Sequence, residues 1–469
     1  MTGQLPTDRH LVVVGLGLGD EAKGATVDWL CATRRAAGRP VGAVVRFNGG
    51  AQAAHNVVVG DRHHTFHQFG SGTLAGTPTH LGPRVLVEPI SLVREAEELA
   101  GLGAADPLSL ISVDPDALVT TPIHAAANRT REDLRGAGRH GSTGLGIGET
   151  VWYDLTYRDG VRVGDCADRR RLIGRLDRLA RHYAPLLAQG EHDHPSVAAL
   201  ADLLIEFGGA VRTAGTEELV RRAQIGALVF EGAQGVLLDE WRGFHPHTTW
   251  STTTPANAVA LLHEAGLGAP YVLGLTRAYA TRHGAGPLPT EAPELAARLP
   301  EPHNGAGRYQ GGWRVGHLDL VTLRYALQVA GPVDGLAVSH LDAVTGAGLW
   351  VADAYDLPSG ERIDRLTPGP AQDLDHQARL TALVSEARPR LRPMPTSAAT
   401  LSELALLDVP IVLTATGPDR ADRVEKEQTH PYEVDLPVSS PSRRASGPGP
   451  DHAGAADAAA AQPPLLTAA

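Results

Sequence analysis

Residues 11–30, LVVVGLGLGDEAKGATVDWL, constrain the fold more than any other segment of the chain. The apolar run at residues 11–14 leads into a glycine-rich turn, and an amphipathic segment follows at residues 25–30. A strand, a loop and a helix in this order direct backbone N–H groups and a helix N-terminus at one place, which is a phosphate-binding geometry. The turn also carries Asp20, Glu21 and Lys23. Phosphate binding requires only the lysine and the glycines, so the added acids indicate metal binding or proton transfer.

Two other interpretations of this loop compete with a catalytic one. It resembles an ordinary glycine-rich turn between a strand and a helix, a pattern that also occurs without a ligand. Gly17, Gly19 and Ala22 also fit the dinucleotide pattern G-x-G-x-x-A, which requires an acidic residue about 20 positions later for the ribose hydroxyls. The chain has no Asp or Glu between Asp28 and Asp61. This gap disfavours an NAD-dependent oxidoreductase.

The third interpretation is a nucleotide loop that differs from the Walker pattern. The Walker pattern requires Ser or Thr after its lysine, whereas Gly24 follows Lys23 here. The segment is therefore predicted to be a non-Walker phosphate loop, in a domain similar to the P-loop NTPases.

The composition disfavours several classes of protein. The net charge of -11 argues against a broad nucleic-acid surface, and the aromatic content of 4% argues against stacking platforms for single strands. Cys31 and Cys166 are too few for a disulfide framework, which fits a reducing compartment. The first residues, MTGQLPTDRH, lack a secretion signal, and no uncharged apolar stretch reaches the roughly 18 residues of a membrane span. We therefore expect a cytoplasmic protein without membrane or nucleic-acid partners.

Strand-like and helix-like segments alternate along the chain. Strands are expected at residues 11–15, 41–47, 109–113, 227–230, 271–275, 335–338 and 410–414. Helices are expected at residues 25–35, 93–99, 170–187, 196–214, 253–264, 320–329 and 397–407. This alternation predicts an α/β fold with a large, mostly parallel central sheet flanked by helices, together with smaller subdomains.

Three parts of the chain are distinguished. Residues 1–10 are interpreted as an N-terminal extension, and residues 11–436 as one catalytic domain. Residues 437–469 are rich in Pro, Ser, Gly and Ala and have almost no bulky apolar side chains. Such a segment cannot bury enough surface to offset its ordering entropy, so we expect a disordered tail.

Several motifs become specific when they are read together. In chain order they are GDEAKGA (19–25), RFNGGAQAAHN (46–56), GSTGLGIG (141–148), FEGAQGVLLDEWRGFHPHTT (230–249), GLTRAYATRHGAGPLPTE (274–291), DGLAVSHLD (334–342) and TATGPDR (414–420). From about residue 10 to about residue 425, this order and content resemble the adenylosuccinate synthetase family. The resemblance implies a GTP-dependent ligase that joins aspartate to IMP in purine biosynthesis.

The resemblance also implies a mechanism in which GTP phosphorylates the purine O6 and the amino group of aspartate then displaces that phosphate. Asp20 matches the general base that removes the N1 proton and also contacts Mg2+. His55 matches the acid that stabilises the transferring phosphoryl group, and Lys23 would hold the phosphates. The main-chain carbonyl of Ala54 matches the second protein contact of Mg2+.

Residues for both nucleotides follow from the same resemblance. Thr143, Gln234 and Thr249 match contacts to IMP. Arg158 is the nearest match to an arginine that reaches the IMP phosphate from a neighbouring subunit, which implies a homodimer. Asp342 can accept hydrogen bonds from the N1 and N2 donors of guanine, which adenine does not offer. The implied GTP contacts are Gly19, Glu21, Gly24, His340, Asp342, Thr416 and Gly417.

The chain departs from the family pattern most clearly in the loop expected to bind the amino acid. Aligned at Gly316 and Asp319, the loop AGRYQGGWRVGHLD at residues 306–319 has Gly311 and Trp313 where the family has arginines. Aligned at Gly307 and Arg308 instead, it contains a small insertion, and Arg308 and Arg314 could compensate from shifted positions. A charge-assisted hydrogen bond contributes about 1.5–3 kcal/mol, so the loss of two would weaken a dicarboxylate by roughly 3–6 kcal/mol. His340 stands where the family usually has lysine.

These departures leave three alternatives to the default reaction of aspartate with IMP. One is a paralogue with the same activation step but another amine donor or purine nucleotide, in specialised metabolism. Another is a catalytically silent nucleotide-binding subunit, against which the presence of Asp20, Lys23 and His55 argues. Relatives that act on deoxyguanylate lack the catalytic aspartate, so Asp20 favours an IMP-like substrate.

Overall fold

The computed structural model of the protein describes residues 5–139, 141–301, 304 and 307–426. Its centre is a ten-stranded sheet with the strand order β20-β19-β15-β11-β1-β10-β2-β5-β7-β9. Neighbouring strands are parallel throughout, except that β20 runs antiparallel to β19 at one edge. This arrangement confirms the predicted α/β class and the mostly parallel sheet. The predicted disordered tail at residues 437–469 lies outside the described residues.

Every strand expected from the sequence is present in the central sheet. Its strands are β1 (Leu11–Gly15), β2 (Ala43–Arg46), β5 (Thr79–Leu81), β7 (Ile111–Val113), β9 (Arg212–Thr213), β10 (Leu228–Gly235), β11 (Tyr271–Arg277), β15 (Gly335–Ser339), β19 (Ile411–Ala415) and β20 (Arg423–Glu425). Smaller sheets pair β3 (His55–Val59) with β4 (Arg62–Phe66), β6 (Leu86–Val87) with β8 (Leu118–Val119), and β12 (Ala280–His283) with β13 (Trp313–Gly316). A further small sheet contains β14 (Leu318–Asp319), β16 (Trp350–Asp356), β17 (Arg362–Ile363) and β18 (Arg388–Pro393).

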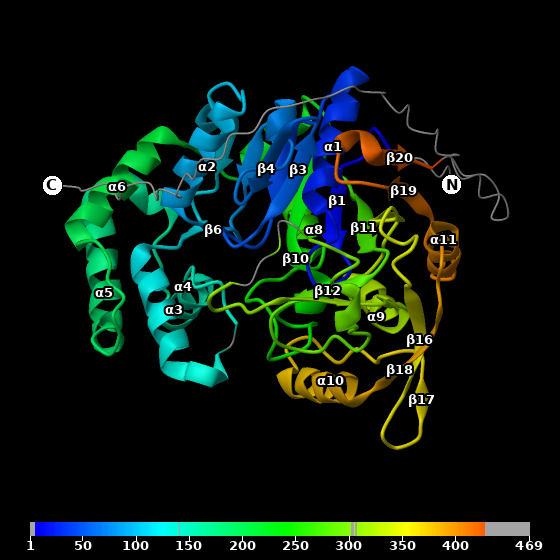
Figure 1. Cartoon of the computed structure of the whole chain (residues 1–469). Helices are drawn as coiled ribbons and strands as arrows, with labels where there is room; N and C mark the ends of the chain where they lie inside the picture. The colour runs from blue at the N-terminus through cyan, green and yellow to red at the C-terminus, as the bar shows by residue number, and fades with distance from the viewer. Residues whose placement is uncertain (1–4, 140, 302–303, 305–306, 427–469) are drawn as a thin grey trace, which may run out of the picture.

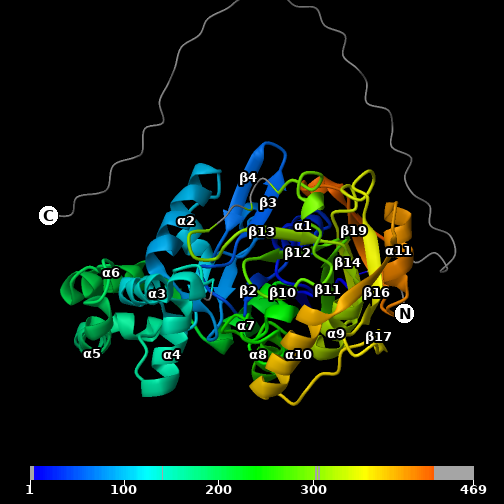
Figure 2. The same cartoon turned by 60° about the horizontal axis from the view of Figure 1, so that its bottom comes forward.

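Alternation along β1 explains how helices cover both faces of the sheet. Leu11 and Val13 pack in one apolar cluster with the side chains of α1 (Lys23–Ala36). Val12 and Val14 face the opposite cluster, which includes residues of α7 (Thr216–Ala223) and α8 (Ala256–Glu264). Figure 2 shows α7 and α8 beside β10 and β2, away from α1. A central strand covered on both faces must be apolar throughout, as the sequence LVVVG is.

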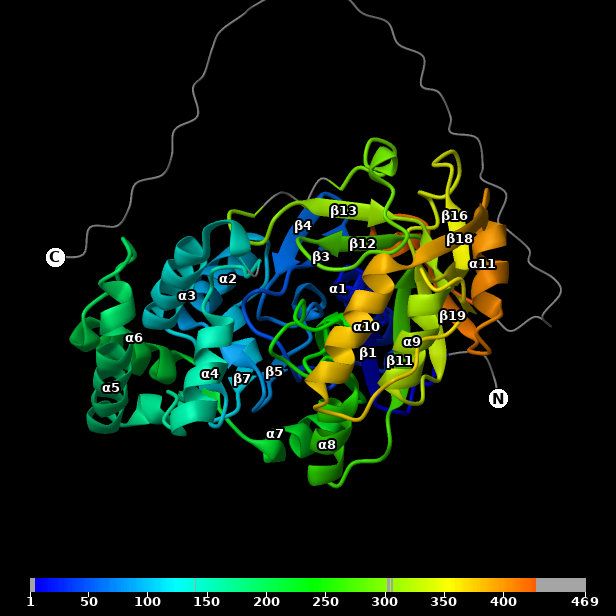
Figure 3. The same ribbon diagram turned by 90° about the horizontal axis from the view of Figure 1, so that it is seen from below.

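The remaining helices lie in two groups beside the sheet. The described helices outside the β1 layers are α2 (Pro89–Gly101), α3 (Pro122–Arg135), α4 (Ile147–Tyr157), α5 (Arg169–Leu187), α6 (Val197–Ala210), α9 (Leu320–Ala330), α10 (Leu374–Glu386) and α11 (Ser397–Ala405). Helices α3 to α6 gather on one side of the central strands, and the β16–β18 sheet with α11 lies on the other (Figure 1). The β12–β13 ribbon lies between these two groups (Figure 3).

One helix prediction was wrong at its C-terminal end. The helix expected at residues 196–214 ends at Ala210, and Arg212–Thr213 forms the edge strand β9 beside β7. Gly208 and Gly209 weaken the last helical turn, and the free edge of β7 offers backbone partners to the residues that follow. The helix expected at residues 253–264 begins at Ala256, directly after Pro255.

The described part of the N-terminal extension packs against the sheet. Leu5 is buried, and its N–H donates to the Glu425 carboxylate at 2.7 Å. The carbonyl of His10 accepts from the N–H of Tyr271 at 2.7 Å, and His10 Nδ1 accepts from the N–H of Leu228 at 3.0 Å. Through these bonds, the segment that precedes β1 is attached to strands β20, β11 and β10 of the central sheet. None of the described helices combines the length and the apolarity that a membrane crossing requires.

Candidate active site

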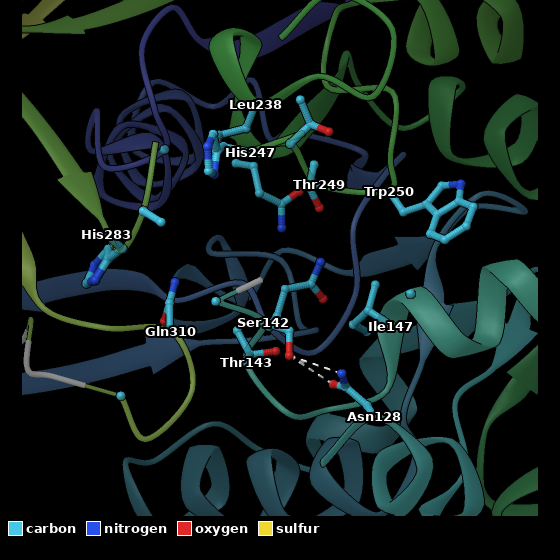
Figure 4. A pocket seen from close by; sticks show the side chains of 18 of the residues that line it. Asn128, Ser142, Thr143, Ile147, Leu238, His247, Thr249, Trp250, His283 and Gln310 are labelled. Atoms are coloured by element: carbon cyan, nitrogen blue, oxygen red, sulfur yellow. Dashed lines mark hydrogen bonds between the residues drawn. The ribbon is translucent and has the colours of Figure 1, made fainter. Parts of the chain in front are cut away.

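A cavity of about 920 Å³ opens at the carboxyl ends of β1, β10 and β2. Because the three strands are parallel neighbours, the loops that follow them meet at this edge of the sheet. Predicted site residues that line the cavity are Gly19, Asp20, Ala54, His55, Thr143, Gln234 and Thr249. The fold thus brings together residues that lie up to 230 positions apart in the chain. Figure 4 shows Thr143 and Thr249 among the lining side chains.

The loop after β1 is folded around an internal ion pair. Glu21 accepts a hydrogen bond from the N–H of Gly19 at 2.8 Å, and its other carboxylate oxygen lies 2.8 Å from Lys23 Nζ. Lys23 also donates to the Gly19 carbonyl, and both charged side chains are buried. The lysine is therefore held at the base of the loop. Ala22 precedes α1 in a left-handed conformation with φ of 65°, which disfavours residues other than glycine.

Close packing explains why glycine follows this lysine. A Cβ atom on Gly24 would lie 2.6 Å from His55 Cβ. The Ser or Thr of a Walker loop would clash here, so the first turn of α1 can approach His55 only without a side chain.

Asp20 presents a partly buried carboxylate to the cavity. Its main-chain carbonyl accepts from Arg277 Nη1 at 3.1 Å, and its Oδ2 lies 3.7 Å from His283 Nε2. Burial raises the pKa of Asp20, although the nearby His283 and Arg277 act in the opposite direction. Among the described residues, no donor makes a hydrogen bond to its carboxylate oxygens. Asp20 is therefore available to accept a proton or to bind a cation.

His55 is oriented by a buried carboxylate. Its Nδ1 donates to Glu231 Oε1 at 2.7 Å, and Glu231 also accepts from the N–H and the hydroxyl of Ser71. Burial lowers the pKa of His55 to about 4. Burial alone would raise the pKa of Glu231, but His55, Arg46 and Ser71 outweigh it and hold that pKa at about 2. The pair at neutral pH is a neutral imidazole and a carboxylate, and it fixes the ring tautomer.

Gln234 reaches the cavity because β10 bulges. Val13 pairs with Glu231 and Gly15 with Gly235, so three residues of β10 face one residue of β1. Gln234 has a φ of 58°, and its Oε1 is buried without a hydrogen-bond partner. A strained backbone and an unpaired buried acceptor in a cavity wall are features of a ligand site.

The residues predicted to bind guanine lie apart from this cavity, at the carboxyl ends of β15 and β19. The N–H of Leu341 donates to the Ala415 carbonyl at 3.1 Å, which joins the loop of Asp342 to that of Thr416 and Gly417. Asp342 and Thr416 are exposed. His340 directly follows β15 in the same loop as Asp342, and burial lowers the pKa of His340 well below its usual value.

Arg158 and the two arginines of the amino-acid loop do not line the cavity. Arg158 is exposed at the C-terminal end of α4, whose N-terminal residues do line it. Arg308 is 69% exposed and lies 3.5 Å from Asp133. Arg314 is bound to Glu291 by two nitrogens and also donates to the carbonyls of Gly284 and Gly286.

Comparison with known proteins assigns the chain to a family. A family model described as adenylosuccinate synthetase matches residues 12–424. The adenylosuccinate synthetase of Anaeromyxobacter sp. (strain K) is 36% identical over 442 residues, which cover 88% of this chain and 98% of that protein. That of Acidithiobacillus ferrooxidans is 33% identical over 446 residues, covering 89% and 98%. The chain belongs to the adenylosuccinate synthetase family.

Solved structures have the same fold. The fully ligated adenylosuccinate synthetase of Plasmodium falciparum matches with a TM-score of 0.74 at 22% identity, covering 89% of this chain and 100% of that one. The succinoaminodeoxyadenylate synthetase of cyanophage S-2L, bound to dGMP and dATP, matches with a TM-score of 0.57 at 16% identity, covering 90% and 96%. The adenylosuccinate synthetase fold therefore extends over nearly the whole described chain.

Five residues that line the cavity or contact its predicted residues were not predicted from the sequence. They are Asn128, which is bonded to Ser142 in Figure 4, and Glu231, Arg277, His283 and Gln310. Glu231 and His283 lie inside quoted motifs, but their partners are 176 and 263 positions away. Local patterns therefore carried no signal for these contacts.

The donor set beside Asp20 fits the Mg2+ that the family resemblance implies. Asp20 offers carboxylate oxygens and Ala54 a main-chain carbonyl, and Mg2+ prefers oxygen ligands. Within the described part of the chain, no group of three or more His, Cys, Asp and Glu side chains forms a metal cage. Two protein oxygens with phosphate and water would suit Mg2+, which commonly binds through substrate phosphates.

Proposed function

We propose that this protein is a GTP-dependent ligase that phosphorylates the O6 of IMP and replaces it with the amino group of L-aspartate. One observation carries the proposal: the Asp20 carboxylate, free of hydrogen bonds from described donors, faces the same cavity as His55 and Gln234, beside the lysine-bearing loop. Asp20 and His55 supply the base and the acid that O6 phosphorylation needs. Membership of the adenylosuccinate synthetase family supports the same reaction.

In the first step, Asp20 accepts the N1 proton of IMP. The electrons released from N1 shift through C6, so that O6 attacks the γ-phosphorus of GTP. The bond between that phosphorus and the bridging oxygen breaks, and GDP leaves. The raised pKa of Asp20 makes it a better proton acceptor than an ordinary aspartate, provided that it is ionised.

In the second step, the neutral amino group of aspartate adds to C6. The C6–O6 bond breaks, phosphate leaves with O6, and the nitrogen gives one proton to the departing phosphate. His55 stabilises charge on the phosphoryl group in both steps. Its low pKa describes the site without ligands, and an adjacent phosphate dianion favours a protonated ring. Glu231 holds the ring so that the same face stays directed at the cavity.

The N-terminus of α1 offsets phosphate charge through its backbone N–H groups. Lys23 is buried in an ion pair with Glu21, and it adds to this charge when it exchanges the carboxylate for phosphate. Mg2+, held by Asp20 and the Ala54 carbonyl, would neutralise charge developing on the phosphate oxygens.

The strand order gives GTP a suitable path along the sheet. Adjacent strands are about 4.8 Å apart, so β15 and β19 lie about 10 and 14 Å from β1. An extended nucleoside triphosphate covers this span, with guanine at Asp342, Thr416 and Gly417 and the γ-phosphate at the loop after β1. IMP would occupy the cavity on the other side of β1, against Thr143, Gln234 and Thr249.

Arg158 supports a homodimer. Its side chain is exposed and lies outside the cavity wall of its own subunit. An arginine in this place can serve the IMP phosphate only by reaching a second copy.

The Asp20→Asn variant tests the proposal. We expect wild-type protein with IMP, GTP, Mg2+ and aspartate to release phosphate and form adenylosuccinate, detected by mass spectrometry. Asp20→Asn should lose turnover by at least about 10³-fold while retaining GTP binding, because an amide cannot accept the N1 proton. Normal turnover of the variant would exclude Asp20 as the base.

A further inference from the structure

The amino-acid loop carries tryptophan at a position where the family resemblance predicts arginine, and that tryptophan has a specific partner. In the antiparallel β12–β13 ribbon, Trp313 lies directly opposite His283. The two rings are 4.6 Å apart between centroids and meet edge-on at 64°. A directly opposed cross-strand pair of rings packs as one unit. Trp313 therefore fixes the orientation of His283, which lines the cavity.

The arginines that line the cavity are already engaged. Arg131 is paired with Glu149 at 2.7 Å, and Arg135 with Glu132 at 2.8 Å. Arg282 donates to three main-chain carbonyls, those of Ala285, Pro287 and His247. No described arginine that lines this cavity therefore has an unpaired guanidinium, and Arg314 is paired as well. Arg308 lines a neighbouring cavity of about 450 Å³ that shares Thr143, Gly307 and Gln310 with the first, and its guanidinium lies 3.5 Å from the Asp133 carboxylate.

Two other hydrogen-bonding side chains of the cavity wall remain available. His283 Nδ1 is buried without a hydrogen-bond partner. The Gln310 side chain makes no hydrogen bond with the described residues, and it lines the cavity near His283 in Figure 4. The two backbones touch, because a Cβ on Gly284 would lie 2.0 Å from the Gln310 carbonyl oxygen and the Gly284 N–H donates to Gly312 at 2.9 Å.

The chemistry of the reaction places the amine donor at this end of the cavity. The donor attacks C6 of the purine, and C6 is bonded to the N1 atom whose proton Asp20 takes. The donor must therefore lie within a few bond lengths of Asp20. His283 Nε2 is 3.7 Å from the Asp20 carboxylate, so its ring borders the space that the donor must occupy.

We propose that His283 and Gln310 bind the carboxylate groups of the amine donor, in place of the two missing arginines, with Trp313 holding the His283 ring. This inference rests on the proposed function and names the residues that select its amino-acid substrate. The imidazole N–H and the carboxamide NH2 would donate to carboxylate oxygens, a role that needs no net charge. The donor class is an α-amino acid whose carboxylates are recognised by hydrogen bonds.

The test separates amino-acid binding from the activation of IMP. The Michaelis constant for aspartate is measured at saturating IMP and GTP for wild type, His283→Leu and Gln310→Leu. Positional isotope exchange in GTP, followed with IMP but without aspartate, reports the first step alone. His263→Leu is the matched control, because His263 is exposed on α8.

We expect each variant to raise the Michaelis constant for aspartate by about ten- to a hundredfold, the value of one hydrogen bond to a charged group. In Gln310→Leu, the Michaelis constant for IMP and the isotope exchange should stay within about twofold of wild type, as should all values for the control. His283→Leu also removes a ring that lies 3.7 Å from the Asp20 carboxylate, so only its Michaelis constant for aspartate is compared. His283→Asn retains an N–H donor close to the ring position and should recover most of the aspartate affinity. Gln310→Leu keeps the test decisive if His283→Leu disturbs the packing of Trp313.

Three outcomes would overturn the inference. An unchanged Michaelis constant for aspartate in both leucine variants would exclude these residues from donor binding. A parallel fall of isotope exchange in Gln310→Leu would place that residue in the first step instead. Absence of aspartate-dependent product from wild type would overturn the proposed function itself, which is distinguishable because it does not involve the variants.

Discussion

Replacing Glu231 with glutamine tests whether one buried carboxylate both stabilises the fold and prepares His55. Glu231 has no exposed surface and accepts three hydrogen bonds, from His55 Nδ1 at 2.7 Å, the Ser71 N–H at 2.9 Å and the Ser71 hydroxyl at 2.5 Å. Glutamine keeps one acceptor oxygen but presents an NH2 group to at least one of these donors. A buried donor without an acceptor costs about 1–3 kcal/mol, and the loss of charge assistance adds to it. We expect Glu231→Gln to lower the free energy of unfolding by about 3 kcal/mol.

The same change should slow phosphoryl transfer. The carboxylate raises the pKa of His55 and orients its ring, so the variant has a ring that is harder to protonate and less well fixed. We expect positional isotope exchange in GTP, measured with IMP, to fall by about a hundredfold.

Glu95→Gln is the matched control for this experiment. Glu95 is also buried and accepts three hydrogen bonds, from the N–H groups of His67, Gln68 and Phe69, at 2.8 to 3.2 Å. Denaturant unfolding should show a similar loss of stability in both variants, whereas isotope exchange should fall only in Glu231→Gln. Equal exchange in the two variants would refute the role assigned to the Glu231–His55 pair.

Three further changes have expected outcomes. Ala22→Gly should raise the free energy of unfolding by roughly 0.5–1 kcal/mol, because glycine relieves the left-handed backbone at φ 65°; a lower denaturation midpoint would contradict this. Arg420→Leu should lower the free energy of unfolding by about 3–5 kcal/mol in the same assay, because Asp28 is buried and accepts from two guanidinium nitrogens at 2.6 and 2.7 Å. A loss below about 1 kcal/mol would show that Asp28 binds another partner. Burial lowers the pKa of His80 and His124 from 6.5 to about 4 and about 3, so the unfolded chain binds protons first as pH falls. Stability present above pH 6.5 should therefore decline toward pH 4, by about 2.7 kcal/mol per pH unit for these two groups, and urea titrations that show no decline would refute neutral burial.

Local sequence patterns predicted the fold class and the loop at its centre, but not every element. The strand, the turn and the helix that LVVVG and its glycines predict lie within about 25 residues of each other, so local sequence determines them. β1 and α1 formed as predicted. The edge strand β9 was not predicted, because it depends on pairing with β7, about 100 residues earlier in the chain.

The candidate site was only partly predictable for the same reason. Asp20, His55 and Gln234 were predicted because motifs contain them, and the fold brings them to one cavity. The hydrogen bond between His55 and Glu231 joins strands far apart in sequence, and no pattern indicates it. Arg420, inside the motif TATGPDR, binds Asp28 of α1, so a motif expected near guanine also contributes to tertiary structure.

The hydrogen bond from Leu5 to Glu425 has a practical consequence for rearranging the chain. It brings two segments 420 positions apart into contact at one edge of the sheet. In a variant that leaves out residues 1–4 and 427–469, a short linker would join them, with new ends opened at the exposed turn around Gly360, between β16 and β17. Such a circular permutant would keep every strand in its present neighbourhood.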